Sequence, residues 1–134
     1  PWVDPAALAA AMNGHQLPGV RFEPTEFTPS ASPSVPEPRF AGLAVPGVRI
    51  VVVDPAAVEP VALGVHLLAE LSGQAAAVGQ GPIIDRPEML DLLAGTDRLR
   101  RGLAEGRGPG DLVAEWSSEV AAFDELRRPY LLYD

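Results

Sequence analysis

Short apolar runs alternate with proline- and glycine-rich breaks along the chain, and the spacing within each run predicts a helix or a strand. Asp4 followed by Pro5 is typical of a helix start, because the carboxylate caps free N–H groups and proline at the first helical position loses no hydrogen bond. The apolar positions that follow form one stripe: Leu8, Ala11 and Met12. We therefore expect a helix over residues 5–13.

Residues 20–27 predict an extended strand, because the prolines in and after this segment prevent a regular helix. Side chains of a regular strand alternate between its two faces, which places Phe22 and Phe27 on opposite sides. Both rings enter one core only if the strand bends or bulges near Pro24. The proline- and serine-rich segment 30–38 is expected to be an exposed loop without secondary structure.

The clearest strand is the β-branched run VRIVVV at residues 48–53. Such a run predicts burial on both faces and a central place in a sheet, with Arg49 pointing outward. Pro60 then opens a second helix that is apolar nearly all round and is expected to be well covered. Residues 74–82 are small, polar and glycine-rich and predict a loop, after which residues 83–84 predict a short edge strand.

The last third of the chain predicts further helices. Residues 88–93 indicate one or two helical turns, and Thr96 caps a helix with a basic outer face. The last helix begins at Gly110. Its apolar residues form one stripe that is expected to face the core: Leu112, Trp116, Val120 and Phe123. Pro129 ends this helix, and the residues through Tyr133 are expected to be extended, in a position to add a strand.

These elements amount to four or five helices and three or four short strands without regular alternation. We class the fold as α+β, with a small mixed sheet packed with helices. A length of 134 residues suits one domain with a single core. The chain starts with PWVD, without an initiator methionine or a signal peptide, and is expected to be part of something longer.

The formal net charge of −8, with only 10 Lys and Arg residues, argues against nucleic acid as a partner. No apolar run is long enough for a transmembrane helix. The chain has no cysteine, which excludes disulfides and thiolate zinc sites. The spacing of His15 and His66 matches no metal motif, so we expect no metal or other cofactor and interpret His66 as a core or surface histidine with satisfied hydrogen bonds.

Glu23 and Glu26 are the first candidates for chemistry, because glycosidases use two carboxyl groups either about 5 Å apart for retention or roughly 6.5–9.5 Å apart for inversion. Along an extended strand they lie about 10 Å apart with side chains on opposite faces, which favours a scaffold role. The glycine-rich segments 73–81 and 102–110 lack phosphate-loop patterns, and no serine lies in a nucleophile elbow. The residues therefore show no complete catalytic site.

Arg39 beside Phe40 is the more interesting pair, because a cation can bind a carboxylate while a sugar face stacks on the ring. The alternative is an ordinary exposed arginine at a strand edge, which is the commoner situation. The residues alone leave both interpretations open.

Six segments stand in a characteristic order: PWVD (residues 1–4), LPGVRFEPTEFTP (17–29), RFAG (39–42), PGVRIVVVD (46–54), LDLLAGTDRLRRGL (90–103), and LVAEW with FDELRRPYLLY (112–116 and 123–133). In order and spacing the chain resembles the C-terminal domain of the exo-β-N-acetylmuramidase family, the NamZ/YbbC-type proteins once described only as a family of unknown function. The family usually has a Lys-Tyr-like pair where Arg39 and Phe40 stand, so the cation is kept and a hydroxyl is lost.

The resemblance implies a two-domain protein in which a Rossmann-like N-terminal domain holds the catalytic residues and residues 1–134 form the C-terminal domain. The implied activity is removal of N-acetylmuramic acid from the non-reducing end of peptidoglycan fragments. The implied location is the cell envelope or the outside of the cell, with the cytoplasm left open. The expected partners are the N-terminal domain and peptidoglycan fragments.

Under this hypothesis the domain forms one wall of the sugar cleft and supplies no catalytic residue. Arg39 is expected to meet the lactyl carboxylate of muramic acid. The further candidate wall residues are Phe40, Arg21, Glu23 and Tyr130. The rival hypothesis is a non-catalytic interaction domain that docks through an apolar patch around Trp2 and the tail 130–133.

Overall fold

In the computed structural model the chain divides into two compact units, Pro1–Asp85 and Arg86–Asp134. The length of the chain predicts a single core instead. The structure describes residues 2–132. The segment 78–86, at which the division falls, buries no side chain. The prediction of one core is therefore wrong, because this stretch of small and polar residues offers nothing to pack.

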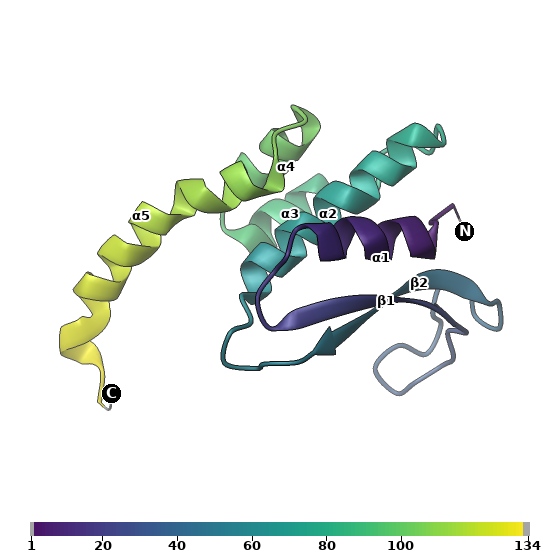
Figure 1. Ribbon diagram of the computed structural model, residues 1–134, viewed down its shortest axis with the longest axis horizontal. Helices are drawn as coiled ribbons and strands as arrows, with labels where there is room; N and C mark the ends of the chain where they lie inside the picture. Colours follow the sequence, from purple (N-terminus) through teal and green to yellow (C-terminus); the bar gives the residue numbers. More distant parts are fainter. Residues whose placement is uncertain (1, 133–134) are drawn as a thin grey trace. The chain divides into compact units, whose positions relative to one another are not determined.

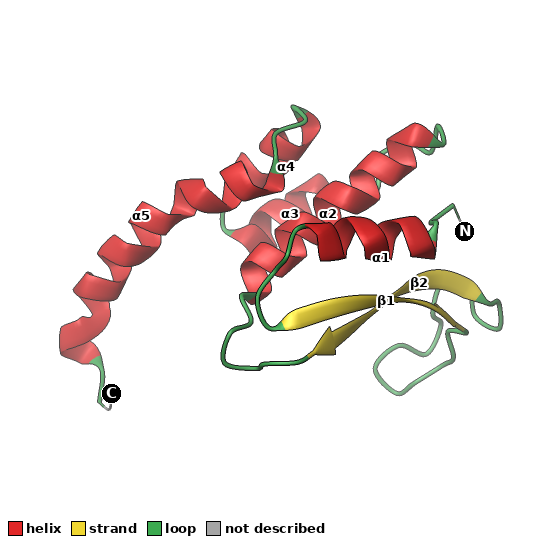
Figure 2. Ribbon diagram, viewed as in Figure 1, coloured by secondary structure: helices red, strands yellow, loops and turns green. Residues whose placement is uncertain are grey.

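The first unit consists of α1 (Pro5–Gly14), β1 (Val20–Phe27), β2 (Val45–Val52) and α2 (Pro60–Ala77), as Figure 1 and Figure 2 show. The predicted start of α1 is confirmed, because the Asp4 carboxylate accepts hydrogen bonds from the N–H groups of Ala6 and Ala7, both at 3.0 Å. The loop predicted from residue 74 is wrong at its start, since three alanines extend α2 and alanine is the best helix former.

The two strands pair antiparallel in an unbroken register that runs from Val20 opposite Val52 to Phe27 opposite Val45. No bulge interrupts it, and the two phenylalanines take opposite faces as a regular strand requires. Phe22 is 4% exposed and belongs to the core, whereas Phe27 is 56% exposed. The bulge near Pro24 that would bring both rings into one core is therefore not present, and only Phe22 is in the core.

The sheet of residues 2–132 has these two strands alone, so β2 is not a central strand. Val52 and Val53 are about half exposed, although their β-branched pattern predicts burial on both faces. Residues 83–84 form no strand. The α+β class is confirmed, with a sheet that is smaller than predicted and antiparallel instead of mixed.

The core of the first unit lies between α1 and the strands, where Leu8, Ala9 and Met12 pack on Phe22. Asn13, at the end of α1, ties the helix to β1. Its side-chain amide donates to the carbonyl of Phe22 at 2.8 Å, and its side-chain oxygen accepts from the N–H of Phe22 at 2.9 Å. The helix and the strand are thus joined at the same residue that packs between them.

A second polar link joins the start of the chain to the end of α2. The Gln74 side chain accepts a hydrogen bond from the N–H of Asp4 and donates one to its carbonyl, both at 3.2 Å. This link places the segment before α1 beside the segment that follows α2.

The second unit consists of α3 (Pro87–Ala94), α4 (Arg98–Ala104), α5 (Pro109–Arg127) and the 3₁₀ turn η1 (Arg128–Tyr130). The three predicted helices are confirmed. The N-cap position of α4 is Asp97 instead of the predicted Thr96, although the Thr96 hydroxyl still accepts a hydrogen bond from the N–H of Arg98 at 3.2 Å. Leu112 of α5 is 1% exposed and lies against Gly102 of α4, where an added Cβ would collide with it.

The apolar stripe predicted on the last helix faces a core only at its beginning. Leu112 is buried, but Val120 and Phe123 are 63% and 61% exposed, so the prediction is wrong for the second half of the helix. The reason is length, because α5 has 19 residues and α4 has 7. Residues 131–132 form no strand, and Tyr133 lies outside the described residues.

Gly19 provides a test of the turn between α1 and β1. Its φ is +72°, and a Cβ there would lie 2.9 Å from Val58 and clash with the carbonyl of Asp54. Gly19→Ala is expected to lower the free energy of unfolding by about 1–3 kcal/mol. Gly64→Ala, inside α2 with no atom within 4 Å, is the control and is expected to raise it by about 0.5–1 kcal/mol. Urea unfolding measures both, and equal effects would contradict the steric explanation.

Candidate functional site

A surface hollow of about 460 Å³ lies in the first unit. Three segments border it: the start of the chain, the loop between β1 and β2, and the segment after α2. The lining residues are Trp2, Arg39, Phe40, Gln80, Gly81, Pro82, Ile83 and Asp85. The hollow combines a cation, a carboxylate and two aromatic rings, which are groups that recognise polar ligands with an apolar face.

Arg39 is the only cationic side chain among the described residues that line this hollow. Its Nη1 lies 3.8 Å from Oδ2 of Asp85, and its Cζ lies 5.9 Å from the ring centroid of Phe40. The side chain of Arg39 is 84% exposed, so solvent screens this ion pair and little free energy holds it closed. Arg39 can therefore exchange Asp85 for another anion at small cost.

Phe40 has an unusual backbone conformation. Its φ is 59°, in the left-handed region that bulky residues rarely adopt. The carbonyl of Phe40 accepts a hydrogen bond from the N–H of Leu43 at 3.0 Å, and Gly42 donates to Pro29 at 3.1 Å, which closes the loop around it. Such strained conformations persist only where the surrounding structure imposes them, and they are enriched at active sites and ligand-binding sites.

The other predicted site residues lie elsewhere. Arg21 and Glu23 form an ion pair at 2.8 Å on β1, and the alternation of the strand places both on the face opposite Phe22. Tyr130 belongs to the second unit and is 80% exposed. Of the five predicted wall residues, the hollow contains Arg39 and Phe40.

Sequence reasoning missed the contributions of Trp2, Gln80 and Asp85 to the hollow. Asp85 is the one that a sequence signal could have suggested, because it is the acidic residue that ends a segment predicted to be a loop and an edge strand. The rival hypothesis expects Trp2 in an apolar docking patch, and the structure places it at the border of the hollow.

His15, His66 and Glu70 form a polar cluster where the residue that ends α1 meets α2. The Nε2 atom of His15 lies 2.7 Å from Oε1 of Glu70, and the rings of His15 and His66 meet edge to face at 4.4 Å. His66 is 9% exposed, and its Nδ1 has no hydrogen-bond partner among the described residues. The prediction of a satisfied histidine is therefore wrong for this nitrogen.

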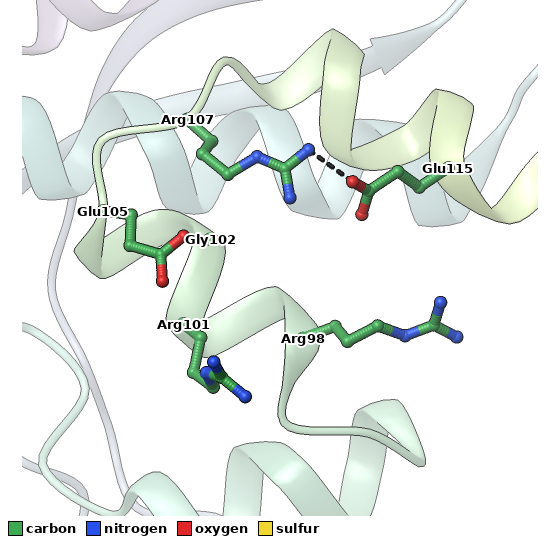
Figure 3. Close-up of a pocket in the computed structure, with 6 residues that line it drawn as sticks. All are labelled: Arg98, Arg101, Gly102, Glu105, Arg107 and Glu115. Carbon is green, nitrogen blue, oxygen red and sulfur yellow. Dashed lines mark hydrogen bonds and ion pairs between the residues drawn. The ribbon is translucent and has the colours of Figure 1, made fainter.

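The second unit has its own hollow, of about 340 Å³, between α4 and the start of α5 (Figure 3). Its lining residues are Arg98, Arg101, Gly102, Glu105, Arg107 and Glu115. Arg107 donates to Glu115 at 2.5 Å, and Arg98 holds Glu119 through two hydrogen bonds of 2.9 and 2.7 Å. These hydrogen bonds lower the pKa of both glutamates.

The predicted basic outer face of α4 is thus neutralised. Arg100 is bound to Asp91 of α3, and Arg101 lies 3.6 Å from Asp97. The carboxylates that hold Arg98, Arg100 and Arg107 lie at 2.5–2.7 Å, much closer than the 3.8 Å of the loose pair at Arg39, so these arginines are less available to an added anion. The second hollow is therefore lined by ion pairs, and the pair between Arg98 and Glu119 joins α4 to α5. It is a structural feature of the second unit and no candidate binding site.

Residues 2–132 were compared with the requirements of a metal site and of a membrane-spanning helix. No group of three or more His, Asp or Glu residues in this range is arranged to hold a metal ion. None of the helices described combines the length and apolar character that a membrane span requires.

Fold and site together define a small α+β domain with an aromatic-lined surface hollow beside one weakly paired arginine. The chain belongs to the family described as "Exo-beta-N-acetylmuramidase NamZ, C-terminal", which matches residues 1–133. It is also similar to a DUF1343 family protein from Bacteroides fragilis of known crystal structure, with 25% identity and a TM-score of 0.80. That match covers 99% of this chain and 34% of the other, so the chain spans about a third of that protein. Comparison with curated proteins gives no match.

The histidine cluster predicts acid-sensitive stability. Burial first, and then the nearby His15, lower the pKa of His66 below its ordinary value, while Glu70 opposes this shift. As the pH falls below about 6.5, the unfolded chain gains a proton that folded His66 resists, so the free energy of unfolding decreases. His66→Leu is expected to flatten this slope between about pH 7 and 5. Urea unfolding at several pH values measures it, and identical slopes in both proteins would contradict the role of His66.

Proposed function

We propose that this domain forms one wall of the cleft in which an exo-β-N-acetylmuramidase binds the terminal N-acetylmuramic acid of peptidoglycan fragments. Membership of the family supports the activity, and the hollow at Arg39 and Phe40 supports a binding role. The catalytic residues would lie in a Rossmann-like N-terminal domain, since the chain spans only 34% of its relative from Bacteroides fragilis. The enzyme would act on the cell wall from the envelope or outside the cell.

The pair formed by Arg39 and Phe40 is the observation on which the proposal rests. N-acetylmuramic acid is a sugar with an added lactyl carboxylate. The guanidinium of Arg39 would bind that carboxylate, since arginine binds carboxylates through two parallel hydrogen bonds. The exposed ring of Phe40 would stack on the apolar face of the sugar.

Asp85 would act as the counter-ion of Arg39 until substrate arrives. The ion pair at 3.8 Å is long and solvent-exposed, so a carboxylate brought by the sugar can displace Asp85. Arg21, Glu23 and Tyr130 stay secondary candidates for the wall, because they lie outside this hollow. The pairing of Arg21 with Glu23 leaves that arginine less available to a ligand.

Substitution of Arg39 in the complete protein tests the proposal. Arg39→Ala is expected to lower kcat/KM on a muramic acid glycoside by about tenfold to a hundredfold, because a hydrogen bond to a charged group is lost. The matching N-acetylglucosamine glycoside lacks the carboxylate, so its kcat/KM is expected to change little. Arg49→Ala, an exposed arginine of β2 outside the hollow, is the control. Unchanged kcat/KM on the muramic acid glycoside would refute the assignment of Arg39.

Binding by the isolated 134-residue chain separates the cleft from the rival docking hypothesis. Titration with N-acetylmuramic acid is expected to shift the NMR signals of Arg39, Phe40 and Asp85. Asp85→Asn removes the competing carboxylate and is expected to tighten binding by up to about fivefold, the value of an exposed ion pair. Weaker binding by Asp85→Asn would contradict competition, and the absence of any shift would favour docking alone.

A further inference from the structure

The second half of α5 exposes an unpartnered apolar face. Val120, Phe123 and Leu126 are 63%, 61% and 68% exposed, and we call these three residues the α5 stripe. Spacings of three residues along a helix of 3.6 residues per turn keep them within one face about 120° wide. Figure 1 shows this part of α5 continuing well past α4.

The α5 stripe continues an interface that already exists in the second unit. Leu112 and Phe123 are eleven residues apart, which is close to three full helical turns, so both point in nearly the same direction. Leu112 uses that direction to pack on Gly102 of α4. This face of α5 is therefore buried against α4 at Leu112 and exposed at the α5 stripe.

The charges next to the stripe are paired among themselves. Arg127 lies 2.6 Å from Asp124, and Arg128 lies 2.9 Å from Glu125. A partner therefore needs no complementary charge at this place, and the surface is suited to an apolar one.

The second unit also has very few buried side chains to stabilise it. Among its described residues, only Leu99, Gly102 and Leu112 are buried. A unit this small buries a low fraction of its surface and is only marginally stable by itself, so additional cover would stabilise it. Half of the exposed large apolar side chains of the described chain belong to it: Met89, Leu92, Leu93, Val120, Phe123, Leu126, Tyr130, Leu131 and Leu132.

We propose that the α5 stripe is the surface on which the remainder of the longer family protein packs, in the same polypeptide. The match to 34% of the Bacteroides fragilis chain supplies the partner, because two thirds of such a protein lie outside this domain. A covalently joined partner is present at high effective concentration, which favours it over a second copy. This proposal rests on family membership and is independent of any role of Arg39.

Hydrogen exchange compares the complete protein with the isolated 134-residue chain. Amides of residues 116–127 are expected to exchange at least about tenfold more slowly in the complete protein, because docking suppresses local opening. The amides of α1, which is covered within its own unit, are the internal control. Equal exchange of residues 116–127 in the two proteins would overturn the proposal.

Substitutions in the complete protein test the stripe itself. Phe123→Ser with Leu126→Ser is expected to abolish the protection of residues 116–127 and to split one thermal transition into two. Ala121→Ser, on the opposite face of α5, is the control and is expected to leave both unchanged. If the complete protein is unaffected while the isolated chain forms dimers that Phe123→Ser dissociates, the partner is a second copy and the proposal fails. Arg39→Ala should leave the exchange pattern intact, so failure of the sugar site would be recognised separately.

Discussion

The contact between Phe22 and α1 is the interaction on which the first unit depends. A two-stranded antiparallel sheet is at best marginally stable by itself and needs a helix on one face. Leu8, Ala9 and Met12 provide that cover, and Asn13 fixes the same strand residue through its backbone. The loop that contains Arg39 and Phe40 connects the two strands, so the position of the hollow follows from this packing.

Local chemistry made much of the fold predictable from sequence. The cap and proline at Asp4 and Pro5, the hydroxyl of Thr96 and the prolines of β1 act within a few residues, and the structure has the predicted elements at each of them. Predictions failed for segments whose apolar side chains are visible in the sequence, because the sequence pattern does not show which other element covers those side chains. The β-branched residues of β2 and the second half of α5 are apolar in sequence, yet both lie partly in solvent.

Some residues of the candidate site could be predicted from the sequence and others could not. Arg39 and Phe40 are neighbours in sequence, so their combination is visible without a structure. Asp85 and Trp2 reach the hollow only through tertiary structure, because the link between Gln74 and Asp4 joins segments that are 70 residues apart. The left-handed backbone of Phe40 has no sequence signal either, since glycine is the residue that normally marks such a position.

The link between Gln74 and Asp4 also decides how the polypeptide enters this unit. Trp2 borders the hollow, and the two hydrogen bonds hold the chain there just before α1 begins. In a longer polypeptide, the residues joined upstream of Trp2 must therefore approach past the rim of the hollow. A change at Gln74 would therefore act at two places at once, on the backbone that precedes α1 and on the border of the hollow.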